Sequence, residues 1–209
     1  MTGASYTAEQ LAELAHVEEA VREQLAARPK RLVHTLGVAD TAVQLALAYG
    51  VDPYLARVTA LLHDWCKDVR DPDLVPVAAE LGIDFGVDLA LVAPLLHGVI
   101  AERILPERFP ELPAEVFRAI GRHTMGAADM SPLDMVIFVA DGIEPGRGDV
   151  PAIQQVRDMV GKAPLPELFF RNFSNGLIYV IETDRYLYPG TLDIYNELVL
   201  ARRNEREHV

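Results

Sequence analysis

The chain places two residue types that bind metals side by side, His63 and Asp64, at the end of an apolar run. Neighbouring residues of a helix point about 100° apart, so these two side chains converge only if the helix ends there. An imidazole nitrogen and a carboxylate oxygen held together in this way form a good ligand pair for a divalent metal. We therefore predict that a helix ends at this pair and that the pair binds a metal.

Two further residues could complete a ligand set. His34 lies on an apolar helical pattern, and Asp141 ends the strongly apolar run that follows Ser131. A buried carboxylate is costly unless it is paired, hydrogen-bonded or bound to a metal. Two imidazoles and two carboxylates suit Fe, Mn, Zn or Mg, and the mixed nitrogen and oxygen donors favour Fe or Mn. Spacing alone does not separate such a site from hydrogen-bonded core histidines, so that alternative stays open.

The elements that must position these residues are predicted to be helices. Thr7 with Gln10 forms a capping-box pattern, and Asp52-Pro53 and Ser131-Pro132 are typical helix starts. Val, Ile and Thr do not alternate in the manner of strands, so we predict a single all-α helical bundle. The expected helices are 7–27, 30–49, 53–65, a short one ending near 80, 94–105, 113–121, 131–141, 151–160, 166–186 and 191–203. Residues 83–93 give no clear prediction.

The composition narrows the classes of partner. Lys and Arg number 19 against 31 Asp and Glu, which disfavours nucleic-acid polymers and anionic membranes as partners. A single cysteine, Cys66, excludes an internal disulfide and fits a reducing cytoplasm. We see no apolar run of the roughly 20 residues that a membrane span needs, and the N-terminus lacks the layout of a signal peptide. We expect a soluble cytoplasmic protein that can still act on a small phosphate compound.

The order His, His-Asp, Asp resembles the HD superfamily, whose members are all-helical, metal-dependent phosphohydrolases. Further segments look like motifs of one branch, the YqeK-type symmetrical dinucleoside-tetraphosphate hydrolases. The sequence "ADGIEPGR", which ends at Arg147, is close to the long motif that marks this branch. The similar segments are residues 31–39, 61–68, 97–98, 123–124, 138–147 and 188–191.

The resemblance implies an enzyme that cuts diadenosine tetraphosphate at its centre into two ADP, with iron as the metal. The metal ligands that it implies are His34, His63, Asp64 and Asp141. The phosphate contacts that it implies are Arg31, Lys67, His97, His123, Thr124 and Arg147. Asp64, Lys67 and His123 would be catalytic, with His123 as a proton donor to the leaving oxygen. Alternatively, His97 and His123 hold a second ion with Asp64 bridging, and Mn, Co or Mg replaces iron.

Other interpretations and boundaries stay open. Another HD phosphohydrolase would act on guanosine tetraphosphate or on a nucleoside mono- or triphosphate, and a non-catalytic HD module would only bind nucleotides. We expect residues 1–28 to be a helical extension, residues 29–203 the hydrolase domain, and residues 204–209 a frayed tail. The apolar face of the first helix serves either packing or self-association as a homodimer. The sequence departs from the branch at Gly142, where the family has Lys, and at Trp65-Cys66, which we expect to be packing residues.

Overall fold

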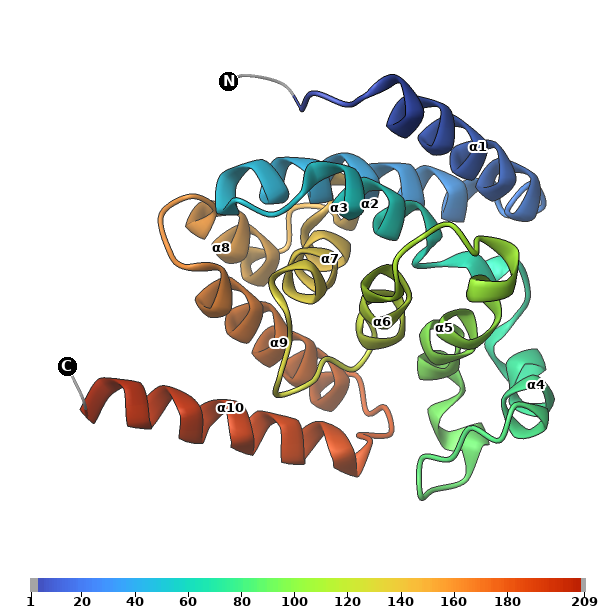
Figure 1. The fold of residues 1–209 in the computed structure, drawn as a ribbon. Coiled ribbons are helices and arrows are strands. Elements are labelled where there is room, and N and C mark those ends of the chain that lie inside the picture. Colours follow the sequence, from blue (N-terminus) through green and yellow to red (C-terminus); the bar gives the residue numbers. More distant parts are fainter. Residues whose placement is uncertain (1–3, 208–209) are drawn as a thin grey trace.

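The structure is a computed structural model that describes residues 4–207, and those residues contain helices and no β-strand (Figure 1). The all-α prediction is therefore confirmed for this part of the chain. The α-helices are α1 (Ala8–Gln24), α2 (Pro29–Tyr49), α3 (Pro53–Leu62), α4 (Leu74–Glu80), α5 (Leu96–Arg108), α6 (Ala114–Arg122), α7 (Pro132–Ile143), α8 (Pro151–Met159), α9 (Leu165–Glu182) and α10 (Pro189–Glu207). Short 3₁₀ helices are η1 (Trp65–Asp68), η2 (Asp71–Asp73), η3 (Leu89–Leu95) and η4 (Pro145–Arg147).

Four helices form the centre of the bundle. Helices α2, α3 and α7 pack against one another, and α6 packs against α3 and α7. The apolar faces of these helices supply much of the buried core. Helix α5 covers α6, α1 covers α3, and α9 covers α7. Helix α10 lies along the outside of α9, where Tyr195 stacks on Phe170 (Figure 1). The predicted site residues therefore lie mainly on the central helices rather than on the periphery.

The predicted start signals act as expected. Thr7 and Gln10 form a reciprocal capping box, and Ser131 forms another with Asp134. The Asp52 carboxylate accepts hydrogen bonds from the first free N–H groups of α3. These caps satisfy amide groups that have no partner within their own helix. The sequence signals thus locate the beginnings of α1, α3 and α7 correctly.

Several predicted boundaries were wrong. Pro94 lies inside the 3₁₀ helix η3 instead of opening a helix, and Pro106 lies within α5 instead of ending it. A proline near the C-terminal end of a helix removes only one of its backbone hydrogen bonds, so α5 can continue past it. Helix α7 continues to Ile143, α9 ends earlier than predicted, and α10 continues to Glu207. The expected tail includes residues 208 and 209, which lie outside the described residues.

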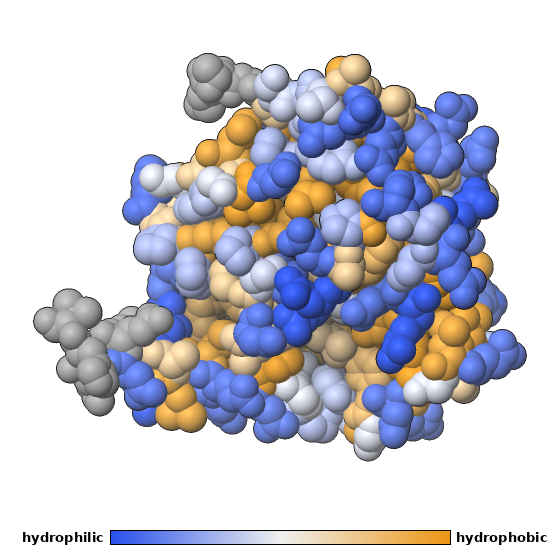
Figure 2. All heavy atoms as spheres, viewed as in Figure 1, coloured by the Kyte–Doolittle hydropathy of each residue, from blue (hydrophilic) through white to orange (hydrophobic). Residues whose placement is uncertain are grey.

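Two helical stretches, Pro29–Tyr49 and Leu89–Arg108, are long and apolar enough to span a membrane by length and composition alone. The sequence expectation of no such stretch was therefore too strict. The criterion carries little weight because core helices of soluble proteins also meet it. The face of the molecule in Figure 2 mixes hydrophilic and hydrophobic residues, with strongly hydrophilic ones near its middle.

The N-terminal helix packs onto the bundle. Leu14, Val17 and Val21 are buried, and α1 contacts α3 and η1. The Tyr54 hydroxyl of α3 donates a hydrogen bond to the Glu13 carboxylate of α1. Of the two uses expected for the apolar face of this helix, packing within the chain is the one observed.

Candidate metal centre

Helix α3 ends immediately before the His-Asp pair. His63 still has helical dihedral angles, whereas Asp64 leaves the helical region at φ −102° and ψ 22° before the 3₁₀ turn η1. Both residues are buried, and His63 Nε2 lies 3.3 Å from Asp64 Oδ2. The change in backbone conformation thus turns two adjacent side chains toward one point, as the sequence predicted.

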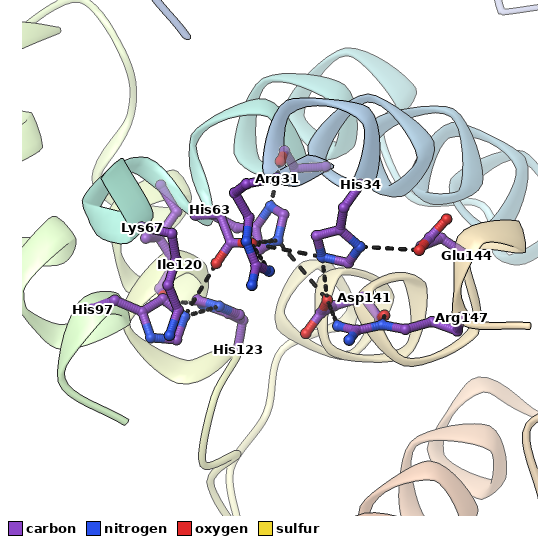
Figure 3. A network of polar contacts seen from close by, with 12 residues as sticks. Arg31, His34, His63, Lys67, His97, Ile120, His123, Asp141, Glu144 and Arg147 are labelled. Carbon is purple, nitrogen blue, oxygen red and sulfur yellow. Dashed lines mark hydrogen bonds and ion pairs between the residues drawn. The ribbon is translucent and has the colours of Figure 1, made fainter. Parts of the chain in front are cut away.

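The other two predicted ligands reach the same point from different helices. His34 on α2 places Nε2 3.0 Å from Asp141 Oδ1 in the last turn of α7 and 3.6 Å from Asp64 Oδ2. His63 Nε2 lies 3.9 Å from Asp141 Oδ1. The structure therefore brings all four predicted metal ligands together, and Figure 3 shows how His34, His63 and Asp141 face one another.

A pair of histidines extends this cluster. His97, near the start of α5, and His123, at the C-terminal end of α6, place their Nε2 atoms 3.0 Å apart. His97 Nε2 also lies 3.3 Å from Asp64 Oδ1. Asp64 thus directs one oxygen toward this pair and the other toward His34 and His63, which is the arrangement of a bridging carboxylate.

The four histidines share one tautomer in their neutral form. Each Nδ1 is 2.6 to 3.0 Å from an oxygen that accepts hydrogen bonds. The acceptors are the Glu144 carboxylate for His34 and the backbone carbonyls of Ala60, Pro94 and Ile120 for His63, His97 and His123. Since these oxygens only accept, the ring proton lies on Nδ1 and each Nε2 presents a lone pair. Four lone pairs therefore face one region.

This arrangement of lone pairs fits a bound cation. The Nε2 atoms of His34 and His63 are buried and have no hydrogen-bond partner among the described residues. The Nε2 lone pairs of His97 and His123 face each other without a proton between them. Buried acceptors without donors are costly, and a divalent metal among them would satisfy several at once. Two groups of potential ligand atoms are each contained within 4.8 Å: His34, His63 and Asp141, and His63, Asp64 and His123.

The carboxylates of the cluster are held in the ionised form. Burial alone would raise the pKa of Asp64, but its contact with His63 outweighs burial and lowers the pKa well below its usual value. Burial would also raise the pKa of Asp141, but the close approach of the His34 imidazole and the charge of Arg147 outweigh burial and lower the pKa. Both side chains are thus in the state that binds metal.

The buried histidine pair is held in the neutral form. Burial lowers the pKa of His97, and burial together with the neighbouring histidines His97 and His63 lowers the pKa of His123 to about 3. At His63 burial also opposes the charge, but Asp64 and Asp141 outweigh it and raise the pKa. Neutral imidazoles are the metal-binding form, so metal binding would release the proton from His63 where it is present.

Two arginines of the predicted phosphate contacts adjoin the cluster. Arg31 Nη1 donates to Asp64 Oδ2 at 2.7 Å. Arg147 donates to the side chain of Asp141 and, through Nε at 2.8 Å, to its backbone carbonyl. Each arginine therefore pairs with a different carboxylate and lies where it could contact an anion bound to the cluster.

The remaining two predicted contacts have other partners. Lys67 Nζ lies 2.7 Å from Asp71 Oδ1, and in Figure 3 Lys67 lies beside His97. The Thr124 hydroxyl is 3.4 Å from the Leu95 carbonyl, although its neighbour His123 lies in the cluster. The structure thus brings Lys67 to the border of the cluster and directs Thr124 to the backbone.

Sequence reasoning assigned no role to Glu144. Its carboxylate is buried and accepts the Nδ1 proton of His34, which fixes the orientation of that ring. Gly37, one turn after His34 on α2, makes this approach possible, because a Cβ there would lie 2.8 Å from Glu144 Oε2. The only sequence signal was the position of Glu144 inside the long motif. Arg157 of α8 was also missed, and it donates to the carbonyls of Ile143 and Glu144 at 2.8 Å each.

The Lys-to-Gly departure at Gly142 has a packing explanation. A Cβ at this position would lie between 2.3 and 2.8 Å from the side-chain amide of Asn172 on α9. That amide donates to the carbonyl of Phe138 at 3.1 Å. The space beside Gly142 is therefore filled by the Asn172 side chain, which would have to move for a larger residue at position 142.

Comparisons with known proteins agree with this geometry. The HD domain family model matches residues 31–146, a range that contains the whole cluster. The chain is similar to the symmetrical bis(5'-nucleosyl)-tetraphosphatases of Staphylococcus aureus (32% identity, 80% of this chain, 86% of the relative) and Halalkalibacterium halodurans (32%, 83% and 91%). A crystal structure of a predicted HD superfamily hydrolase involved in NAD metabolism, from Clostridium acetobutylicum, superposes with a TM-score of 0.78 at 29% identity, over 88% of this chain and 97% of that one.

Proposed function

Because this chain belongs to the HD domain family, we propose that it hydrolyses diadenosine tetraphosphate symmetrically into two ADP. The observation that carries this proposal is the cluster of four Nε2 lone pairs and two ionised carboxylates, bordered by arginines. The names of the relatives, which include the Bacillus subtilis symmetrical bis(5'-nucleosyl)-tetraphosphatase at 28% identity, support the choice of substrate.

We assign the metal to two sets of ligands, each of which would include Asp64. His34, His63, Asp64 and Asp141 would hold a first ion, and His97 and His123 with Asp64 would hold a second. A divalent metal bound there would lower the pKa of a bound water molecule and polarise a phosphoryl oxygen of the substrate. The mixed nitrogen and oxygen donors support iron, with Mn, Co and Mg as the alternatives to compare.

The protein's own cations would hold the phosphate chain across the cluster. Figure 3 shows Lys67 at one end of the cluster, Arg147 at the other and Arg31 between them. In the reaction, a water oxygen would bond to one inner phosphorus while the bond from that phosphorus to the bridging oxygen breaks. The bridging oxygen leaves with the other ADP, and the proton that the water loses passes to solvent. Arginine and lysine stabilise the charge that spreads over the phosphate oxygens in such a displacement. Thr124 would contact the outer phosphates after its hydroxyl leaves the Leu95 carbonyl.

The geometry supports His123 as a ligand rather than as a proton donor. In the neutral form its only ring proton lies on Nδ1, which donates a hydrogen bond to the carbonyl of Ile120, so Nε2 has no proton to give. The leaving group also needs little protonation, because a terminal phosphate has its second pKa near 6 and is stable as an anion near neutrality. Charge stabilisation by Arg31, Lys67 and Arg147 would therefore contribute more than acid catalysis.

Product analysis tests the proposal. Protein stripped of metal with a chelator and reloaded separately with Fe²⁺, Mn²⁺, Co²⁺ or Mg²⁺ is incubated with diadenosine tetraphosphate, and the products are separated by chromatography. We expect ADP alone, with the highest rate in Fe²⁺. AMP plus ATP would exclude central cleavage, and faster hydrolysis of guanosine tetraphosphate or of nucleoside mono- or triphosphates would favour another HD phosphohydrolase. Binding without turnover would favour a non-catalytic module.

Further assignments of domain boundaries, location and partners accompany this function. We propose that residues 29–203 form the hydrolase domain with residues 1–28 as a helical extension, whose helix α1 packs on the bundle, and that the protein acts in the cytoplasm. The substrate is a small nucleotide, and the acidic chain does not favour nucleic-acid or membrane partners. Light scattering tests the homodimer that the sequence suggested.

A further inference from the structure

A cavity of about 670 Å³ lies beside the metal cluster, between the first turn of α2 and the segment that joins η1 to η2. None of the six histidine and aspartate residues of the cluster lines it, whereas Arg31 and Lys67 do. It is therefore a separate space that shares two cations with the candidate active site. A cavity of this volume is large enough for a nucleotide-sized ligand.

The cavity is strongly basic in an otherwise acidic protein. Its charged lining consists of Arg28, Lys30, Arg31, Lys67, Arg70 and the carboxylate Asp71. Five cations thus accompany one anion, although acidic residues outnumber basic ones 31 to 19 in the whole chain. A cavity lined by one sign of charge attracts ligands of the opposite sign. Its chemistry is that of a site for phosphates.

The cations of the cavity differ in whether they already have a partner within the protein, and therefore in how readily they can bind a ligand. Arg31 donates to Asp64, Lys67 pairs with Asp71, and Arg70 pairs with Asp73. The Lys30 ammonium has no ion pair or hydrogen bond in the part of the chain that the structure describes. Lys30 is exposed on the first turn of α2, so it can contact a ligand without giving up an internal partner.

We propose that this cavity binds the second nucleoside-diphosphate half of the substrate, with Lys30 contacting its phosphates. The inference rests on the proposed function. Central cleavage places the inner phosphates at the metal ligands, so the two halves of the substrate must extend from the cluster in two directions. Arg147 lies toward one direction, and the shared side chains Arg31 and Lys67 lead into the cavity in the other (Figure 3). A mononucleotide held at the cluster would leave the cavity unused, so contacts in the cavity favour a dinucleotide.

Matched charge reversals at two exposed lysines test this assignment. Lys30→Glu changes a cavity cation, whereas Lys162→Glu makes the same change of net charge after α8, outside the cavity. With diadenosine tetraphosphate at low salt, we expect Lys30→Glu to raise KM about tenfold, the effect of a lost contact of roughly 1.4 kcal/mol. The kcat should stay within about twofold, and Lys162→Glu should match the parent. Lys30→Ala should raise KM less, in the same direction.

Calorimetric titration of the metal-loaded protein with ADP gives a second readout that does not need turnover. We expect two ADP sites in the parent and in Lys162→Glu, one of which is weakened in Lys30→Glu. Equal KM values for the two charge reversals, or two unchanged ADP sites in Lys30→Glu, would overturn the assignment of the cavity. A parent protein that does not cleave diadenosine tetraphosphate would instead refute the proposed function, and the ADP titration would still decide whether the cavity binds a nucleotide.

Discussion

The polar cluster has two halves that differ in composition and exposure. The first half consists of His34, His63 and Asp141, and the second half consists of His97 and His123. The first half has its own carboxylate, and the side chain of Asp141 is 22% exposed. The second half is buried and has no carboxylate of its own. The first half is therefore equipped to bind a metal and meet a substrate, whereas the second depends on a ligand from outside.

Asp64 is the residue that connects the halves. Its Oδ2 faces His34 and His63, while its Oδ1 faces His97 at 3.3 Å. Without this carboxylate the second half would hold only two neutral nitrogens, which is a weak site for a hard divalent cation. The comparison thus indicates that Asp64 is the carboxylate that joins the two halves, next to the ring contact between His63 and His123.

One histidine of the first half, His34, differs from the other three in what orients its ring. His63, His97 and His123 each donate to a carbonyl three residues earlier in the chain, so their orientation is set locally. His34 instead donates to Glu144, which is 110 positions away. One ring in the cluster therefore depends on the packing of α2 against the end of α7.

Asp64→Asn should have the largest effect, because it weakens both halves at once. We expect metal content to fall in both halves and hydrolysis to decrease by about 1000-fold or more, since several kcal/mol of charge stabilisation would be lost. Elemental analysis with product chromatography measures both quantities, and circular dichroism checks the fold. Parental metal content and turnover would show that the halves do not need this bridge.

His123→Ala should separate the halves. We expect it to remove one bound ion while the first half keeps the other, whereas His34→Ala should weaken the first half. In His123→Ala, the rate of hydrolysis should decrease by roughly 100-fold, which corresponds to a loss of about 2.7 kcal/mol of transition-state stabilisation. The measurement is the number of ions per chain after loading with Fe²⁺ or Mn²⁺. An unchanged count in His123→Ala would remove the second half as a metal site.

Glu144→Gln should act on the first half alone. The side chain keeps its size but loses the charge that favours the His34 tautomer, so metal affinity should decrease about 10- to 100-fold. Gly37→Ala should act similarly, because its methyl group would displace the Glu144 carboxylate. A matched control is Gly176→Ala on α9, where a Cβ would meet no atom within 4 Å. Metal titration followed by calorimetry measures the affinity, and an effect at Gly176 equal to that at Gly37 would contradict the steric explanation.

The two halves also show how far sequence alone could predict this site. The convergence of His34, His63, Asp64 and Asp141 was predictable, because helix caps and apolar periodicity are local patterns and the order of these residues resembles a known family. The contact between Glu144 and His34 was not predictable, because it depends on the packing of α2 against α7 and on the missing Cβ of Gly37. The boundaries of α5 and α7 were missed for a related reason. Proline and glycine weaken a helix locally, but packing on neighbouring helices can outweigh that cost.

Substitution of Cys66 should have the smallest effect, and it tests whether the second half of the cluster includes this thiol. It follows Asp64 by two residues, is 5% exposed, and packs in the core near Trp65. Burial raises the pKa of its thiol to about 12, so at pH 8 the thiolate that reacts with thiol reagents is almost absent. We expect no labelling of the native protein at pH 8 and one equivalent after denaturation. Cys66→Ala should leave the ion count unchanged and lower stability by about 1 kcal/mol through lost packing. Loss of an ion in this variant would contradict the packing role. It would show that the Cys66 sulfur is a metal ligand of the second half, and a sulfur ligand would favour zinc there.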